Sequence, residues 1–243
     1  MIDAPVSLRL AWWGTPWLRG RVVPDLLLDA VIGDEATHTV APDGPGVAAQ
    51  GLLVGLARLR AAGATSFGLA LPVEGDPTGL GGPAAFNAAA LEAGEAVVVA
   101  GADVGLVPQA VGAATTWVAL PAARRPLPDV GEADRTLRLA LLETAEALAA
   151  LDVARWRPEV ADRLMNLRHR PGLVAPDGVP ARCVDLASRG LQAVEIADLA
   201  LEDHGGAVSA AEITARERAL RPLERAGRVA LVTAGSPEVW PPH

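Results

Sequence analysis

The chain has 243 residues, of which 51% are hydrophobic and 21% charged, the composition of an ordinary globular protein. All 21 basic residues are arginine, and no lysine or tyrosine is present. Their absence excludes Schiff-base chemistry, a phosphate-loop lysine and a tyrosyl acid. The net charge of −8 disfavours nucleic acid as a partner, and the scarcity of Lys, Tyr, Asn and Phe indicates a GC-rich genome.

The sequence shows neither the pattern of a secretory signal nor that of a membrane-spanning helix. The single cysteine, Cys183, cannot form an internal disulfide, and no Cys/His spacing suits zinc. Residues 1–5 contain an acid where a secretory signal has basic residues, and no run of 18 apolar residues occurs. We therefore expect a soluble, cytoplasmic protein without a membrane-spanning segment.

The first half alternates short apolar runs with glycine and proline, which predicts strands interleaved with helices. Strands are expected at residues 6–12, 37–41, 65–71, 95–100, 104–107 and 115–120. Helices are expected at residues 24–32, 47–62 and 83–94. A turn at residues 101–103 makes a hairpin, so the sheet is expected to be mixed.

The proline-rich stretch 122–130 separates an α/β region, residues 1–123, from a mainly helical region, residues 124–243. Helices are expected from residue 129, where leucines form one apolar seam, and at 158–169, 180–203 and 209–227. The run 228–234 reads as a strand that must pair with the N-terminal sheet. The expected fold is α/β, with α+β as the alternative. It comprises a small mixed sheet with flanking helices, a C-terminal layer of three or four helices, and a last strand returning to the sheet as part of one folding unit.

A glycine-rich loop before the helix at 83–94 is the first candidate site. A strand-to-helix junction of this kind can hold an anion, and Gly79, Gly81 and Ala84 fit a dinucleotide-binding pattern with Asp103 at a distance suited to a ribose. The candidate ligand-binding residues are Glu74, Asp76, Gly79, Gly81, Gly82 and Asn87. The alternative is a plain connector, because the two acids would repel a phosphate unless a cation intervened.

An acidic stripe on the helix at 180–203 is the second candidate. Glu195, Asp198 and Glu202 lie three and four residues apart on a helix that is apolar on its other sides. Carboxylates packed there need a cation, either Mg²⁺ or a guanidinium such as Arg182, Arg189 or Arg216.

Two E-x-x-D motifs, beginning at Glu159 and Glu195, carry a resemblance to a known family. The pair is similar to the paired acidic motifs of helical nucleotide pyrophosphohydrolases, which implies Mg²⁺ as a cofactor. The motifs depart from that pattern because a proline-rich break separates them and the first points away from its own apolar face.

Three tryptophans near the N-terminus form the third candidate. Trp12 and Trp13 in a strand would face opposite ways, so one enters the core and the other remains available for a subunit interface together with Trp17. Core packing alone is the alternative. His38 is expected to be structural or exposed, and Cys183 to be a buried small residue.

These observations give two hypotheses for function. The first is a soluble binding or assembly protein that self-associates through the helical half or the tryptophans, because no complete catalytic constellation is found. The alternative is an enzyme acting on a phosphorylated or nucleotide-like small molecule, with Asp76 and the glycine loop at its mouth and Mg²⁺ on Glu195 and Asp198. A small-molecule ligand is thus possible in either case, whereas nucleic acid and membrane are not expected as partners.

Overall fold

The computed structural model describes residues 4–42, 48–123, 125–150, 172–202 and 210–241. The α-helices are α1 Val6–Leu18, α2 Pro24–Ile32, α3 Leu52–Ala61, α4 Ala84–Ala93, α5 Val130–Ala150, α7 Ala181–Glu202 and α8 Ala210–Ala234, followed by the 3₁₀ helix η1 Pro237–Val239. The strands are β1 Thr37–Ala41, β2 Gln50–Gly51, β3 Ser66–Ala70, β4 Ala96–Ala100, β5 Val104–Val111 and β6 Ala114–Pro121. The helix predicted at 158–169 lies outside the described residues.

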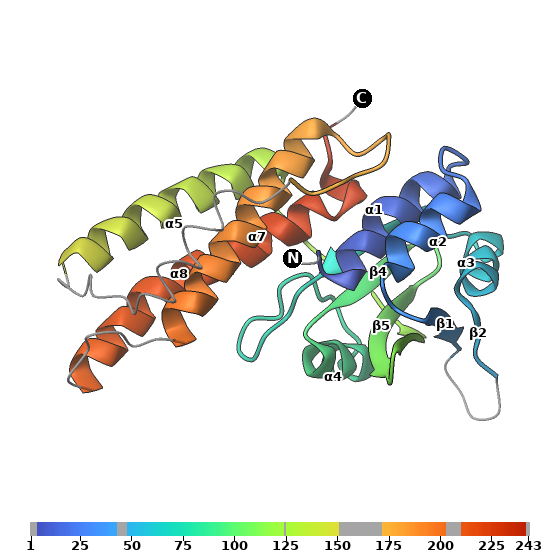
Figure 1. Cartoon of the computed structure of the whole chain (residues 1–243), viewed down its shortest axis with the longest axis horizontal. Coiled ribbons are helices and arrows are strands. Elements are labelled where there is room, and N and C mark those ends of the chain that lie inside the picture. The colour runs from blue at the N-terminus through green and yellow to red at the C-terminus, as the bar shows by residue number, and fades with distance from the viewer. Residues whose placement is uncertain (1–3, 43–47, 124, 151–171, 203–209, 242–243) are drawn as a thin grey trace.

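The strands form one mixed sheet in the order β2-β1-β6-β5-β4-β3. β1 and β6 pair in parallel, whereas all the other neighbours are antiparallel. The α/β class, the mixed sheet and the helical layer are confirmed. Figure 1 shows α5, α7 and α8 as an elongated bundle that extends away from the sheet.

Residues 6–12 are the first turns of α1, so the predicted strand is wrong. α1 is packed between the sheet and the helical bundle, and its buried residues occupy nearly every side, including Leu8, Leu10 and Trp12. A helix without a polar face shows no 3.6-residue period, and its apolar run is indistinguishable from a buried strand.

Helices cover both faces of the sheet. α1, α2 and α3 share a core with the side chains of Val40, Phe67 and Trp117. On the other face α4 packs Phe86 against Gly105, where an added Cβ would lie 2.2 Å from the Phe86 ring. Glycine in β5 therefore lets α4 approach the sheet closely.

The C-terminal run 228–234 continues α8 and is not a strand, so this prediction is also wrong. Ala230, Leu231 and Val232 are buried within the bundle core, and this tertiary packing overrides the strand preference of a β-branched run. The chain nevertheless returns to the sheet, because the amide of Leu69 on β3 donates to the carbonyl of Gly235 at 3.1 Å. The segment after α8 thus covers the edge strand β3.

None of the helices described here is long and apolar enough to cross a membrane.

Candidate functional site

Arg125 joins three separate parts of the chain with its guanidinium. Its Nη1 donates to the backbone carbonyls of Leu69 on β3 and Gly79 in the glycine loop. Its Nη2 donates to Ser236 Oγ at 2.9 Å and to Glu238 Oε1 at 3.2 Å, and its Nε donates to the same Glu238 oxygen at 3.4 Å. An arginine has five N–H groups, and here all five have acceptors. Arg125 is therefore a structural clamp with no donor left for an external anion.

Two glycines make room for this clamp. A Cβ on Gly68 would lie 2.5 Å from Arg125 Nη2, and one on Gly79 would lie 2.7 Å from the Cα of Ala70. Gly79 also has a φ of +86°, in the left-handed region that favours glycine. Gly79 in the glycine loop and Gly68 on β3 are thus explained by packing around Arg125.

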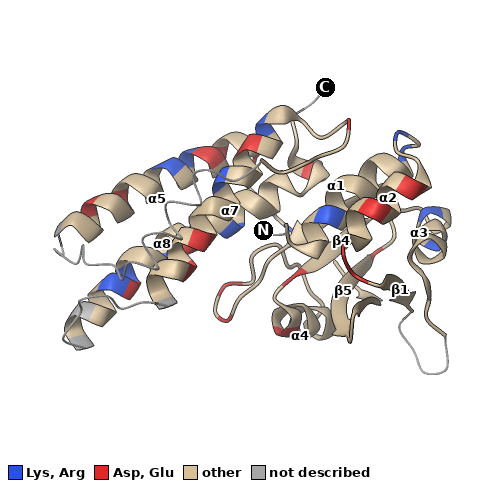
Figure 2. Ribbon diagram, in the orientation of Figure 1, with Lys and Arg blue, Asp and Glu red and all other residues tan. Residues whose placement is uncertain are grey.

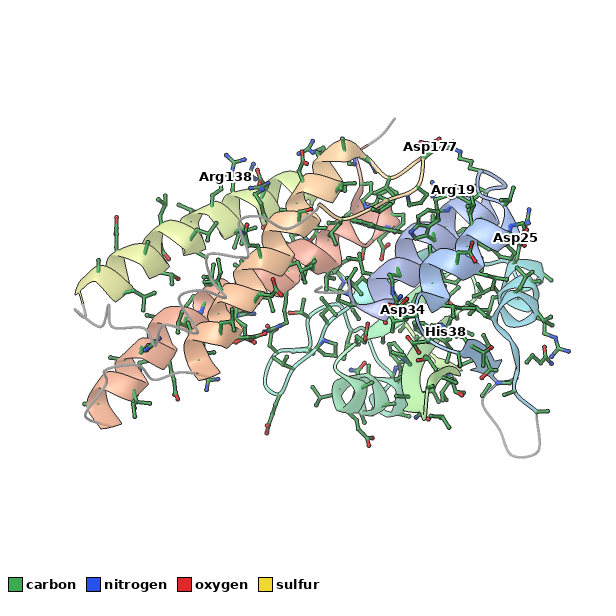
Figure 3. The ribbon with its side chains drawn as sticks, in the orientation of Figure 1. Arg19, Asp25, Asp34, His38, Arg138 and Asp177 are labelled. Carbon is green, nitrogen blue, oxygen red and sulfur yellow. The ribbon has the colours of Figure 1, made fainter. Side chains whose placement is uncertain are left out.

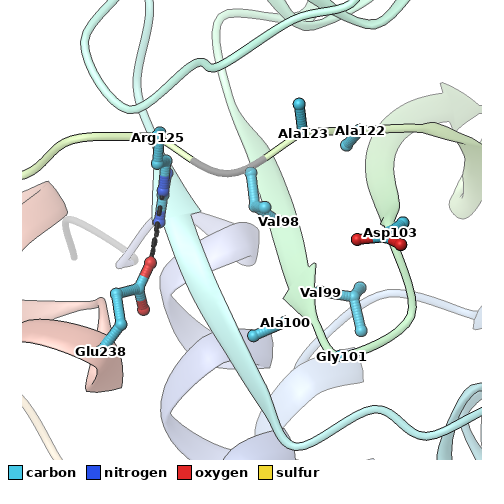
Figure 4. A pocket seen from close by; sticks show the side chains of 9 residues that line it. All are labelled: Val98, Val99, Ala100, Gly101, Asp103, Ala122, Ala123, Arg125 and Glu238. Atoms are coloured by element: carbon cyan, nitrogen blue, oxygen red, sulfur yellow. Dashed lines mark hydrogen bonds and ion pairs between the residues drawn. The ribbon is translucent and has the colours of Figure 1, made fainter.

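A cavity of about 570 Å³ lies beside Arg125, and Figure 4 shows the side chains that line it. Its wall is formed by β4, the β4–β5 turn, the segment after β6 and η1. Asp103 points from the turn toward the Val98 and Val99 side of this cavity (Figure 4). Asp103 also has a φ of 51°, the one positive value among non-glycine residues in the described part of the chain. Because Arg125 and Glu238 form an ion pair with each other, the carboxylate of Asp103 leaves this cavity acidic.

Asp76, a predicted ligand residue, is held by arginines of α8. Its Oδ2 accepts a hydrogen bond of 2.8 Å from Arg228 Nη2 and lies 3.4 Å from Arg225 Nε. Its Oδ1 accepts from Thr78 Oγ1 at 2.9 Å. Burial alone would raise the pKa of Asp76, but these hydrogen bonds and cations outweigh it and lower the pKa below its usual value. The cations next to this acid are two of the chain's own arginines.

The other predicted loop residues do not converge on a shared ligand position. Asn87 Oδ1 accepts from the amide of Gly82 at 2.9 Å, while the Gly82 carbonyl accepts from Ala123 at 2.8 Å. Glu74 and Gly81 are exposed. The connector alternative accounts for these contacts, and ligand binding by this loop stays a prediction.

Two residues of the acidic stripe on α7 have described side chains. Glu195 is half-buried, Asp198 is exposed, and both residues have interaction partners. Arg189, one of the cations considered for the stripe, donates to Asp134 on α5. The side chain of Glu202 lies outside the described residues, and among those described no three His, Cys, Asp or Glu residues are grouped to hold a metal. A Mg²⁺ site here remains a prediction.

The tryptophans follow the core-packing alternative. Trp12 is 2% exposed and its Nε1 donates to the Ala234 carbonyl at 3.1 Å. Trp17 is also buried, with the Arg60 guanidinium 5.7 Å from its ring centre. Trp13 is half-buried and contacts both cores. Because these residues lie on a helix, the argument that neighbouring indoles face opposite ways does not apply.

His38 is a buried structural residue on β1 (Figure 3). Its Nδ1 accepts from Trp117 Nε1 at 3.3 Å, and its Nε2 lies 3.2 Å from Glu35 Oε2. Burial lowers the pKa of His38, and the neighbouring Glu35 opposes that shift only partly. The imidazole is therefore neutral at physiological pH.

A groove of about 780 Å³ runs between α5 and α8 in the helical bundle. Arg218, Arg221 and Arg225 line it from α8, and Leu139 and Glu143 line it from α5. Figure 2 shows acidic positions on α5 toward its C-terminal end and basic positions on α8. The groove therefore combines an apolar edge with charges of both signs.

Comparisons with known proteins identify relatives along nearly the whole chain. The family described as Rv1486c-like protein, N-terminal domain, matches residues 7–133, and its C-terminal domain matches residues 131–232. "Uncharacterized protein Rv1486c" of Mycobacterium tuberculosis is 30% identical, over 97% of this chain and 98% of the relative. "Uncharacterized protein ML1804" of Mycobacterium leprae is 26% identical over the same shares. No solved structure matches the chain.

Proposed function

Because the chain belongs to the Rv1486c-like protein family, whose matched relatives carry names that state no activity, we propose its role from its surfaces. It is a binding or assembly protein that associates with a second copy of itself. The contact is made by the α5–α8 face, which consists of the groove residues Leu139 and Glu143 on α5 and Arg218 and Arg221 on α8, together with the exposed Leu142 one turn from Leu139. The leucines of this face carry the proposal.

The apolar surface of α5 is larger than its own bundle covers. The inward seam, including Ala133, Leu137 and Ala140, is already buried against α7 and α8. Leu139 and Leu142 lie on another side of the helix and are 58% and 63% exposed. Removing apolar surface from water is favourable by about 25 cal/mol per Å², before the entropic cost of association is subtracted. Two such leucines one turn apart are suited to the centre of an interface.

The charges around the leucines favour an identical partner. Glu143 and Glu146 on α5 are exposed, as are Arg218 and Arg221 on α8. Neither arginine has an ion-pair partner within the described ranges. In a two-fold dimer the same patch meets itself, so the acids of α5 can face the arginines of the partner's α8 when the leucines meet at the axis.

Sedimentation velocity tests this proposal. Wild type is expected to be dimeric, and the double variant Leu139→Glu/Leu142→Glu monomeric, because each new carboxylate would be desolvated at the centre of the contact. Leu26→Glu on α2, where the leucine is 52% exposed, is the matched control and should stay dimeric. Glu143→Arg and Arg218→Glu should each weaken the dimer, and their combination should restore it. A wild type that stays monomeric from micromolar to millimolar concentration overturns the proposal.

We do not propose the enzyme alternative. Asp76, which that hypothesis places at the mouth of the active site, is bound by Arg228. All N–H groups of the clamp residue Arg125 already have acceptors, so none is left for a phosphate.

A further inference from the structure

A second cavity, of about 410 Å³, lies at the other side of the β4–β5 turn, between α3 and the ends of the central strands. Most of its wall is apolar, formed by Val40, Leu59, Val104, Ala119, Leu120 and Pro121. Its volume lies within the range of roughly 300–1,000 Å³ that small-molecule pockets occupy, and apolar lining with few polar groups is their usual composition.

This cavity lies at a place in the sheet topology where open α/β sheets bind ligands. β1 and β6 are parallel neighbours, and the cavity opens at their carboxyl ends, around Pro42 and Pro121. The next described elements after β1, which are β2 and α3, lie on one side, whereas the chain after β6 runs toward the β3 edge on the other. Open α/β sheets bind ligands in the crevice where connections from adjacent parallel strands diverge in this way.

Arg58 brings a positive charge to this cavity. Arg58, in the last turn of α3, lines it and is exposed, without an ion-pair partner among the residues described. Gln50 adds one amide group. Asp103 borders both cavities, and Figure 4 shows its side chain at the first one, near Val98 and Val99.

We propose that this cavity binds a small apolar carboxylate. The apolar body lies against Leu59, Val104 and Ala119, and the carboxylate accepts hydrogen bonds from the Arg58 guanidinium at the mouth. A planar guanidinium presents paired donors that match the two oxygens of a carboxylate, which gives this head group preference over an amine or an alcohol. The proposal concerns the sheet region and does not rest on self-association through α5 and α8.

Calorimetry and thermal shift with matched probes test the head group. Hexanoate and phenylacetate should bind and raise the melting temperature, whereas hexylamine and 2-phenylethanol should not. Arg58→Gln should weaken hexanoate binding about tenfold or more, because a charge-assisted pair is lost. Arg19→Gln, an exposed arginine at the end of α1, is the matched control and should bind as wild type.

A second variant tests the location without touching charge. Ala62 is exposed at the rim of the cavity, so Ala62→Phe should close the mouth while leaving the fold unchanged, and should abolish binding. The proposal is overturned if no carboxylate binds, if hexylamine binds as well as hexanoate, or if both variants bind as wild type. The Leu139→Glu/Leu142→Glu protein should bind hexanoate normally, which separates this result from the fate of the dimer.

Discussion

Trp12 and Trp240 donate their indole N–H groups to one and the same acceptor, the carbonyl oxygen of Ala234, at 3.1 and 2.9 Å. Ala234 is the last residue of α8, where helix carbonyls have no partner within the helix. Two indoles, one from the first helix and one from the C-terminal segment, satisfy it. Trp12 therefore fixes α1 to the end of the helical bundle.

Removal of the Trp12 indole should destabilise the protomer without changing its association. We expect Trp12→Ala to lower the free energy of unfolding by about 3–5 kcal/mol, the usual cost of deleting a buried tryptophan. Trp12→Phe should lose less, since a ring remains and Trp240 still caps Ala234. Urea unfolding measures both. A Trp12→Ala protein that keeps its stability but dissociates by sedimentation would support the interface hypothesis for this tryptophan.

Arg125 should be the costliest single arginine to replace. Arg125→Met leaves the carbonyls of Leu69 and Gly79 and the Glu238 carboxylate without their donor, and removing one partner of a buried pair costs about 3–5 kcal/mol. Arg125→Lys should rescue little, because three donors on a flexible stem cannot serve acceptors in four directions. Arg19→Met should change stability by less than about 0.5 kcal/mol. Equal unfolding midpoints for the Arg125 and Arg19 variants would contradict the clamp.

Elements that depend on neighbouring residues were predictable from the sequence, whereas features that depend on distant residues were not. β1 and β3 were predictable because short β-branched or apolar runs lie between glycine-rich turns. α1 and the last turns of α8 were not, because burial on nearly all sides hides the helical period. The Arg125 clamp gave no local signal, since its partners lie 46 to 113 residues away in the sequence. The sequence shows only that Arg125 belongs to an arginine pair in the proline-rich stretch 122–130.

The pairing of Asp76 with Arg228 should make stability fall on acidification. Its pKa is lowered in the folded state, so its stabilisation is complete above the ordinary value of 3.8 and disappears as pH falls through the folded value. Asp76→Asn should cost about 2 kcal/mol at neutral pH, the worth of a hydrogen bond between charged groups. The difference from wild type should vanish in strong acid. Unfolding curves at a series of pH values measure it, and a difference independent of pH would exclude this role of the carboxylate.

Glu95 should have the opposite pH dependence. It accepts a hydrogen bond of 2.8 Å from the amide of Ser7 in the first turn of α1, yet burial raises its pKa and the Ser7 amide opposes this only partly. A raised pKa makes the stabilising contribution complete below the ordinary value of 4.5, and that contribution is lost as pH rises through the folded value. Glu95→Gln, which retains an acceptor but cannot ionise, should be more stable than wild type at about pH 8 and equal to it near pH 4. If the variant is instead less stable than wild type at high pH, the ionised carboxylate is a better acceptor for the Ser7 amide than a neutral group is, which contradicts this prediction.

Gly190 and Gly227 set the distance between α7 and α8. A Cβ on either residue would lie 2.8 Å from the carbonyl oxygen of the other, so alanine at either position must push the two backbones apart. We expect Gly227→Ala and Gly190→Ala each to lower the free energy of unfolding by about 1–3 kcal/mol, as overpacked cores do, in spite of the better helix propensity of alanine. Gly131→Ala in α5 is the matched control, since its Cβ would meet nothing closer than Asp129 Oδ1 at 3.2 Å. The control should keep or gain stability in urea. If Gly227→Ala behaves like Gly131→Ala, the close crossing of the two helices is not what holds the bundle together.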